Sequence, residues 1–175
     1  MPALPFGSRL VLKLEPLVAA AFAPFGEVIE IAADTPHHPV NQGYAERFHD
    51  LARVDTGRAG GHTLVSIFRT RARTLPLRLR LVERHVLGSQ AFVPLSRQRF
   101  LVVVAPAGPP PSAALLRCFV AAPGQGVNLA PGVWHHPLLA LDAGGDFLVI
   151  DRGGPGAAGD CQEHALDGPE VWVEG

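Results

Sequence analysis

The sequence predicts a mainly β protein, a double-stranded antiparallel β-barrel of the jelly-roll type with one short N-terminal helix. Three observations support this fold class. Short apolar runs of strand length follow one another from residue 61 onward. The 19 Gly and 17 Pro residues are scattered between these runs, as turns require. Hydrophobic residues make up 47% and charged residues 18% of the 175 residues, which is typical of a globular domain with a sizeable core.

The chain begins with a segment that carries little pattern. We expect residues 1–10 to be a flexible extension of a single domain that spans residues 1–175. Residues 15–26 predict the short helix, because Pro16 suits a first helical turn and Pro24 with Gly26 would end it.

Two segments separate this helix from the main run of strands. Residues 27–33 alternate polar and apolar side chains, as a strand does. Residues 34–61 are polar and rich in turn residues, so we expect a long loop with little regular structure. Loops of this length in a compact domain often carry function.

The remainder of the chain predicts a succession of strands in one domain. No repeat of fixed period and no change of composition marks a second domain. Short strands with Gly and Pro turns between them favour an antiparallel sandwich or barrel. The predicted strands are residues 62–70, 75–85, 90–95, 99–106, 116–122, 133–141, 146–152 and 169–174.

The predicted strand 75–85 carries unexpected polar residues. Its Leu residues at 75, 77, 79 and 81 share one face with Glu83 and His85, while Arg78, Arg80 and Arg84 share the other. The Leu face should meet the core, because arginines favour water. A carboxylate and an imidazole that face inward need partners, which a metal, a substrate or each other would provide.

Two histidines stand side by side in the apolar segment GVWHHPLLAL. His135 and His136 follow the turn Pro131-Gly132. Neighbouring residues on a strand point to opposite faces, so at most one of these imidazoles faces a given pocket.

The charge balance and the cysteines exclude several classes of partner. Lys and Arg number 15 and Asp and Glu number 16, so no basic field attracts nucleic acid or anionic lipid. No apolar run approaches the ~20 residues that span a bilayer. The N-terminus lacks the pattern of a signal peptide, and two distant cysteines form no disulfide framework. We expect a cytoplasmic protein that binds neither nucleic acid nor membrane.

The two polar segments together resemble the metal site of the cupins, which are small double-stranded β-barrels. Cupin ligands come from a His-x-His segment with a carboxylate a few residues on, and from a second segment with Pro, Gly and then His. Here Glu83-x-His85, Gln90 and His135 occupy these places. The resemblance implies that Glu83, His85, Gln90 and His135 bind a divalent metal, of the Ni or Mn type among others. The alternative is an interior hydrogen-bond cluster without metal.

Four blocks of sequence resemble a more specific family. They are NQGYAERFHDLA, ERHVLGSQAFVPL, GQGVNLAPGVWHHPLLAL and DFLVIDRGG, in this order. Together they are similar to the ureidoglycolate lyase family, formerly described as hydrolases, from about residue 14 to about residue 163. The resemblance implies a cupin-like fold, a homodimer and cleavage of ureidoglycolate to glyoxylate and urea in purine (allantoin) breakdown. The enzyme would be a carbon-nitrogen (amidine-type) lyase without organic cofactor.

The site residues follow from what this reaction needs. A base must take the hydroxyl proton and an acid must protonate the departing nitrogen, and His85, His135 and Glu83 are the candidate catalytic residues. A planar guanidinium suits the substrate carboxylate, and Arg47, Arg69 and Arg152 are candidates for it. Arg84 lies on the wrong face. Asn128 is a further candidate substrate-binding residue.

One departure from the family keeps other functions open. The family has Tyr-His-Arg where this chain has Leu129-Ala130-Pro131. The alternatives are a hydrolase that releases ammonia from the same substrate, a non-catalytic or regulatory cupin that binds a small carboxylate, and a metal-dependent oxygenase. Fold alone does not decide between them.

Overall fold

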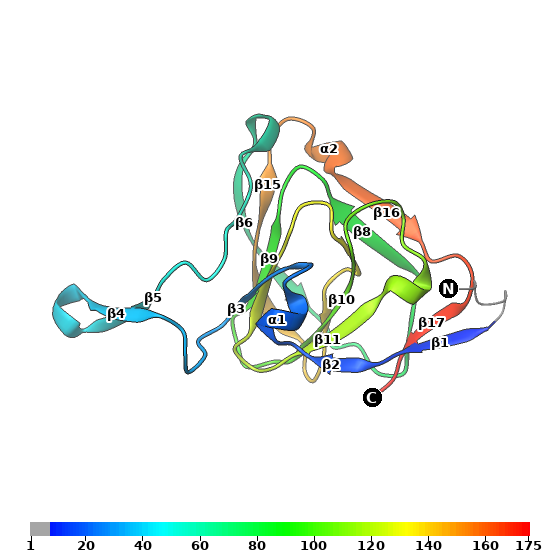
Figure 1. Cartoon of the computed structure of the whole chain (residues 1–175), viewed down its shortest axis with the longest axis horizontal. Coiled ribbons are helices and arrows are strands. Elements are labelled where there is room, and N and C mark those ends of the chain that lie inside the picture. Colours follow the sequence, from blue (N-terminus) through cyan, green and yellow to red (C-terminus); the bar gives the residue numbers. More distant parts are fainter. Residues whose placement is uncertain (1–7) are drawn as a thin grey trace.

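The computed structural model describes residues 8–175, and strands dominate it, as the sequence predicts (Figure 1). Two short helices, α1 (Ala19–Phe22) and α2 (Ala157–Asp160), accompany the strands. Single 3-10 turns occur at Asn41–Gly43, Arg58–Gly60 and Ala113–Leu115. The strands are β1 (Arg9–Leu12), β2 (Leu14–Pro16), β3 (Gly26–Ile29), β4 (His37–Val40), β5 (Ala45–Phe48), β6 (His62–Thr70), β7 (Leu77–Leu79), β8 (Leu81–His85), β9 (Gln90–Pro94), β10 (Phe100–Ala105), β11 (Arg117–Ala121), β12 (Gly126–Leu129), β13 (Trp134–His135), β14 (Leu139–Ala140), β15 (Gly145–Gly153), β16 (Cys161–Ala165) and β17 (Glu170–Val173).

The strands form three stacked layers and a separate hairpin. A five-stranded sheet has the order β3-β12-β9-β15-β6. A seven-stranded sheet has the order β16-β8-β13-β10-β11-β2, with β14 also on β10. A three-stranded sheet, β1-β17-β7, forms the third layer, and β4 pairs only with β5. The fold is therefore a mainly antiparallel, cupin-like sandwich, but the barrel is not closed.

Strand β10 shows why the seven-stranded sheet lies in the middle. Its residues 100, 102 and 104 belong to the core shared with the five-stranded sheet, and residues 101, 103 and 105 belong to the core shared with the three-stranded sheet. A strand buried on both faces is continuously apolar, which is what the run FLVVVA provides.

The predicted strand 75–85 is wrong as a single strand. It breaks at Arg80 into β7 and β8, which belong to different sheets. The alternation of faces restarts there, so that Leu79 and Val82 share one apolar core. Glu83 and His85 still share a face with each other, but not with the leucines of β7. The carbonyl of Arg80 accepts the backbone N–H of Leu166 at 2.9 Å, which extends the pairing of β8 with β16, whereas β7 pairs with β17.

The expected loop 34–61 is also partly wrong, because it contains the hairpin β4–β5. Its turn is built by Asn41, Gln42 and Gly43, all with positive φ. Strand β4 begins with His-His-Pro, a composition that does not favour strands, and this hid it in the sequence. Figure 1 shows the hairpin projecting from the body of the molecule on the side of β6.

Smaller differences concern both ends of the chain. The predicted helix 15–26 shrinks to the four residues of α1, because Leu14–Pro16 pairs with β11 as β2. Residues 1–7 of the expected flexible extension lie outside the described residues, whereas Arg9 and Leu10 belong to β1. The predicted strand 133–141 divides into β13 and β14, which both pair with β10. Strands β1, β12 and β16 and helix α2 were not predicted from the sequence.

Candidate functional site

Three polar side chains meet on the inner face of β8 and β13. The two strands pair antiparallel with His135 opposite Glu83, and His85 lies two residues further along β8. The Nε2 atom of His135 lies 3.4 Å from Oε1 of Glu83, and the rings of His85 and His135 are 5.5 Å apart. One ligand atom from each residue lies within 4.8 Å of the others. We call Glu83, His85 and His135 the triad.

The tautomer of His135 follows from its backbone contact. Its Nδ1 lies 3.1 Å from the carbonyl oxygen of Val133, which only accepts, so Nδ1 carries the proton. In the neutral ring, Nε2 then presents a lone pair to the Glu83 carboxylate. Two acceptors facing each other in a buried place need a proton or a cation between them. The triad is therefore a place for one positive charge.

Burial and mutual charge set the ionisation of the other two members. Burial raises the pKa of Glu83, but the contact with His135 and the neighbouring imidazoles outweigh it and leave the pKa below its ordinary value. Burial, together with the charge of His135, lowers the pKa of His85. At neutral pH the triad thus contains an ionised carboxylate and a neutral His85.

Next to the triad lies a small cavity of about 180 Å³. Cys161 connects the two, since its Sγ lies 3.8 Å from Oε2 of Glu83. The cavity lies where the end of β8, strand β15, helix α2 and the start of β16 come together. The lining residues are His85, Ser89, Asp151, Arg152, Ala157, Asp160 and Cys161.

Arg152 is the buried cation of this cavity, with 6% of its surface exposed. Its Nε donates to the carbonyl of Arg58 at 2.9 Å, and its Nη2 donates to the carbonyls of Ala59 at 3.3 Å and Pro155 at 2.8 Å. Its Nη1 has no partner, and no carboxylate in the described residues forms an ion pair with it. A buried guanidinium without a counter-ion is costly, so the site is prepared for an anion.

Two glycines make room for this arginine. A Cβ on Gly61 would lie 2.4 Å from Nε of Arg152, and one on Gly88 would lie 2.6 Å from its Cβ. Both approaches are closer than any real side chain tolerates. The sequence positions of these glycines are thus explained by the arginine they surround.

Two acidic residues of the cavity were not among the predicted site residues. Asp160 is 4% exposed, and its Oδ1 accepts the backbone N–H of Leu87 at 2.6 Å. Asp151 has an Oδ1 atom without a partner, although it precedes Arg152 in the chain. Asp160 stands after the small residues Gly-Ala-Ala-Gly, a context with no local sign of a site. Its place in the site follows only from the tertiary contact with Leu87, which lies just after β8.

Several buried polar atoms without a hydrogen-bond partner gather at this end of the two sheets. Such atoms are rare in folded proteins, and each one calls for a ligand, a water or an ion. They come from the last residues of β8, β12 and β15, from β13, and from the first residue of β9, which pairs with the end of β12. Within residues 8–175 they are His85 Nε2, Gln90 Oε1, Asn128 Oδ1, His135 Nε2, Asp151 Oδ1 and Arg152 Nη1.

The predicted residue Asn128 lies beside this cavity. It is buried and donates from Nδ2 to Oε2 of Glu27 at 2.8 Å and to the carbonyl of Arg53 at 3.1 Å. It lines a wider, open depression of about 490 Å³, which shares Ser89 with the small cavity. Ala130 and Pro131, at the positions where the sequence departs from the resembled family, line the same depression.

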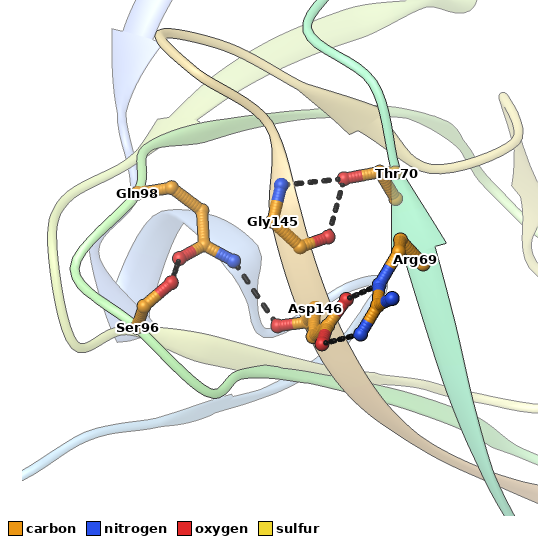
Figure 2. A network of polar contacts seen from close by, with 6 residues as sticks. All are labelled: Arg69, Thr70, Ser96, Gln98, Gly145 and Asp146. Atoms are coloured by element: carbon orange, nitrogen blue, oxygen red, sulfur yellow. Dashed lines mark hydrogen bonds and ion pairs between the residues drawn. The ribbon is translucent and has the colours of Figure 1, made fainter.

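Two predicted arginines lie elsewhere in this chain. Arg47 is an exposed residue of β5 in the projecting hairpin. Arg69 holds both oxygens of Asp146 at 2.9 Å on the surface, beside Thr70, Gly145 and Gln98 (Figure 2). A guanidinium already engaged by a carboxylate has little left for a substrate. The structure does not bring either arginine to the triad within one chain.

Comparison with known proteins gives a consistent result. The sequence profile described as ureidoglycolate lyase matches residues 9–174. A protein of Burkholderia mallei (strain NCTC 10229) named ureidoglycolate lyase is 54% identical over 145 residues, which cover 83% of this chain and 84% of the relative. One of Burkholderia cepacia with the same name is 52% identical over 90% of this chain and 87% of its own length. A protein of Pseudomonas aeruginosa (strain LESB58), which is also named ureidoglycolate lyase, is 49% identical over 87% of this chain and 89% of its own length.

Neither α1 nor α2, nor any other helix in residues 8–175, has the length and apolar character needed to cross a bilayer.

Proposed function

The chain belongs to the ureidoglycolate lyase family and is a lyase, and we propose that it cleaves ureidoglycolate into glyoxylate and urea. The observation that carries this proposal is the cavity beside the triad, in which a buried guanidinium nitrogen without a partner and a neutral imidazole face the same small space. These groups match the carboxylate and the hydroxyl of such a substrate.

The reaction itself is an elimination. Ureidoglycolate carries a hydroxyl, a carboxylate and a ureido nitrogen on one carbon. The hydroxyl proton leaves, the oxygen forms a double bond to carbon, and the carbon–nitrogen bond breaks with its electron pair on nitrogen. A proton added to that nitrogen completes urea, and the remaining aldehyde is glyoxylate. The enzyme must therefore hold the carboxylate and move one proton from oxygen to nitrogen.

Arg152 is the proposed clamp for the carboxylate. Its free Nη1 supplies a charge-assisted hydrogen bond, while its other nitrogens are fixed by backbone carbonyls. Fixing the guanidinium before the substrate arrives lowers the ordering cost of binding. The small volume, about 180 Å³, favours a small acid over a large one.

The triad is the proposed route of the proton. His85 is neutral and presents an unpartnered Nε2 to the cavity, so it accepts the hydroxyl proton. The Glu83 carboxylate stabilises the imidazolium that forms and keeps His135 oriented. His85 then returns the proton to the departing nitrogen, as acid. Asn128 contributes by holding the backbone of Arg53 at the rim of the adjoining depression.

A second use of the same side chains is to hold a divalent cation of the Ni or Mn type. The donor set fits, because the three ligand atoms converge within 4.8 Å and the Nε2 atoms of both histidines lack partners. Gln90, with its unpartnered Oε1, is the proposed fourth ligand. A cation bound there would lower the pKa of the substrate hydroxyl. No organic cofactor is part of this proposal.

The setting of the enzyme belongs to the proposal as well. We propose a homodimer that acts on a small carboxylate in the cytoplasm, in purine (allantoin) breakdown. The relatives' names support the substrate. Cys118 and Cys161 are free thiols, which agrees with a reducing compartment.

The test is an assay of the purified protein on racemic ureidoglycolate that follows urea and ammonia separately, with and without added Ni²⁺ or Mn²⁺. We expect urea above the spontaneous rate and its loss in His135→Ala. The matched control is His38→Ala, which removes an exposed imidazole of β4. Ammonia in place of urea would indicate the hydrolase. No release of either product would reject catalysis and favour a cupin that only binds small carboxylates.

A further inference from the structure

The projecting hairpin is the least supported part of the described chain. We call residues 37–48, which comprise β4, the turn and β5, the arm. The arm pairs only with itself, and none of its residues is buried. A two-stranded hairpin alone is marginally stable in water, so an ordered arm needs a surface to pack against. Figure 1 shows no part of the same chain that covers it.

Strand β6 is the second feature without a partner. It is nine residues long and forms an edge of the five-stranded sheet, with one side paired to β15 and the other open. Apolar side chains are exposed on both of its faces. Val65 and Ile67 are 69% and 54% exposed, and Leu64 and Phe68 are 40% and 42% exposed. A long apolar edge strand left open would aggregate, so such edges are normally covered.

Most of the exposed large apolar residues lie on these two features or in the chain segments beside them. Eleven large hydrophobic side chains are exposed among residues 8–175, and seven of them lie between residues 31 and 68. The apolar surface also continues onto β15, where the half-buried Ile150 and Leu148 stand beside Val65 and Ile67. The seven residues are Ile31, Tyr44, Val54, Leu64, Val65, Ile67 and Phe68.

Strand β6 is complementary to a second copy of itself. An antiparallel pair of β6 strands about a two-fold axis normal to the sheet, through Ser66, places Val65 opposite Ile67 of the other copy. The same register places Leu64 opposite Phe68 on the other face. Opposite residues in an antiparallel pair share a face and stabilise it when both are apolar. No other kind of partner is needed to match both faces.

The area required for a stable dimer involves the arm. At about 200 Å² for a whole large side chain, the exposed fractions of the four apolar residues of β6 amount to roughly 400 Å² per copy. A stable interface buries about 800 Å² per partner. The strand alone therefore falls short, and the arm, which leaves the body on the side of β6, is a further exposed surface on that side (Figure 1).

We propose that a second copy of this chain docks along β6, with the two β6 strands paired antiparallel about Ser66 and each arm packed on the partner's five-stranded sheet. This inference rests on the homodimer of the proposed function and names its surface. The dyad of an isologous interface explains why one strand supplies both halves of each apolar pair.

The first experiment measures the mass of the full chain by sedimentation equilibrium. We expect twice the monomer mass of 18.6 kDa. The variant Ile67→Lys should raise the dimer dissociation constant at least about 30-fold, as for truncation of a central interface residue. The matched control Leu115→Lys alters an equally exposed apolar residue away from β6 and should leave the mass unchanged. A monomeric wild type, or a dimer that Ile67→Lys leaves intact, would overturn the proposal.

A second variant tests the same interface without introducing a charged side chain, which could disturb folding. In a Cys161→Ser background, Ser66→Cys should form an intermolecular disulfide on mild oxidation, because the two copies of residue 66 meet at the dyad. Leu115→Cys, also exposed, is the control and should not crosslink. Absence of the Ser66→Cys crosslink in a folded dimer would refute the register. Urea release is measured separately, so a lost dimer and a lost lyase activity remain distinguishable.

Discussion

At the scale of single residues, the surroundings of Arg152 bear most directly on the proposed function. Its guanidinium is buried, three of its hydrogen bonds go to backbone carbonyls, and one nitrogen remains free beside His85. An arginine used only for structure would have all its donors occupied or exposed. The free nitrogen therefore supports the proposed role of Arg152 as the residue that binds the substrate carboxylate.

Replacing Arg152 with Gln should lower kcat/KM on ureidoglycolate by about 100-fold, because loss of a buried charge-assisted contact costs roughly 2–5 kcal/mol. Steady-state kinetics, with the melting temperature recorded beside it, measures this effect. The control Arg99→Gln removes a surface arginine that is bound to Asp142 and should change nothing in the kinetics. An unchanged kcat/KM in a folded Arg152→Gln protein would remove the clamp from the mechanism.

The two cysteines make a second prediction at this scale. Burial raises the pKa of Cys118 to about 12, and this thiol is buried under the three-stranded sheet. Burial and the nearby Glu83 also raise the pKa of Cys161, but Cys161 is exposed. We expect one thiol to react with Ellman's reagent in the native protein and two after denaturation. Labelling of both at equal rates in the native state would contradict the burial of Cys118.

At the scale of elements, an ion pair links β2 and β11 in addition to their backbone pairing. Arg117 on β11 donates to both carboxylate oxygens of Glu15 on β2, at 3.0 and 2.6 Å. This hydrogen bonding lowers the pKa of Glu15. The pair thus joins β11 to a segment that was predicted to be helical and instead pairs with β11 as a strand.

Stability should depend on pH through this pair. A carboxylate whose pKa is lower in the folded state stabilises the fold above its unfolded pKa, and the contribution is lost as the pH falls through the folded pKa. Thermal melts should therefore give a lower melting temperature for Glu15→Gln than for wild type at neutral pH. The difference between the two melting temperatures should shrink as the pH is lowered. Glu163→Gln, an exposed residue of β16, is the control. A difference in melting temperature that does not change with pH would mean that packing, and not charge, stabilises β2 on β11.

At the scale of the whole molecule, the triad joins elements far apart in sequence. Glu83 and His85 on β8 meet His135 on β13, and the cavity beside them is closed by β15 and α2. Ligands that bind only the folded state stabilise all of it. Binding of a ligand at the triad should thus raise the melting temperature of the whole domain, which is measured independently of catalysis.

A bound divalent cation should raise the melting temperature. If the triad holds Ni²⁺ or Mn²⁺, a concentration one hundred times the Kd adds roughly 2.7 kcal/mol to the free energy of unfolding. Differential scanning calorimetry of the chelator-treated protein with and without the metal measures this gain. His135→Ala should abolish the gain, whereas His38→Ala should keep it. Equal melting temperatures with and without metal would leave the triad as a proton route only.

Local patterns in the sequence predict the mainly β class, most of the strands, and the meeting of Glu83, His85 and His135 in one site. These follow from local periodicity and from motif spacing, which need no knowledge of distant contacts. The four sequence blocks that resemble ureidoglycolate lyases also indicated the family, which the comparisons show. Arg152 was also identified, but only as one of several arginines.

The tertiary structure alone decided which arginine reaches the cavity, because Arg47, Arg69 and Arg152 look alike in sequence and differ only in what surrounds them. It also decided the break at Arg80, where competition between two sheets overrides a continuous alternation of residues. Asp160 lines the cavity because α2 packs near segments that are remote from it in the chain. The arm and the outer edge of β6 have no pairing strand in the described chain. Long-range packing sets these features, and local sequence patterns do not encode it.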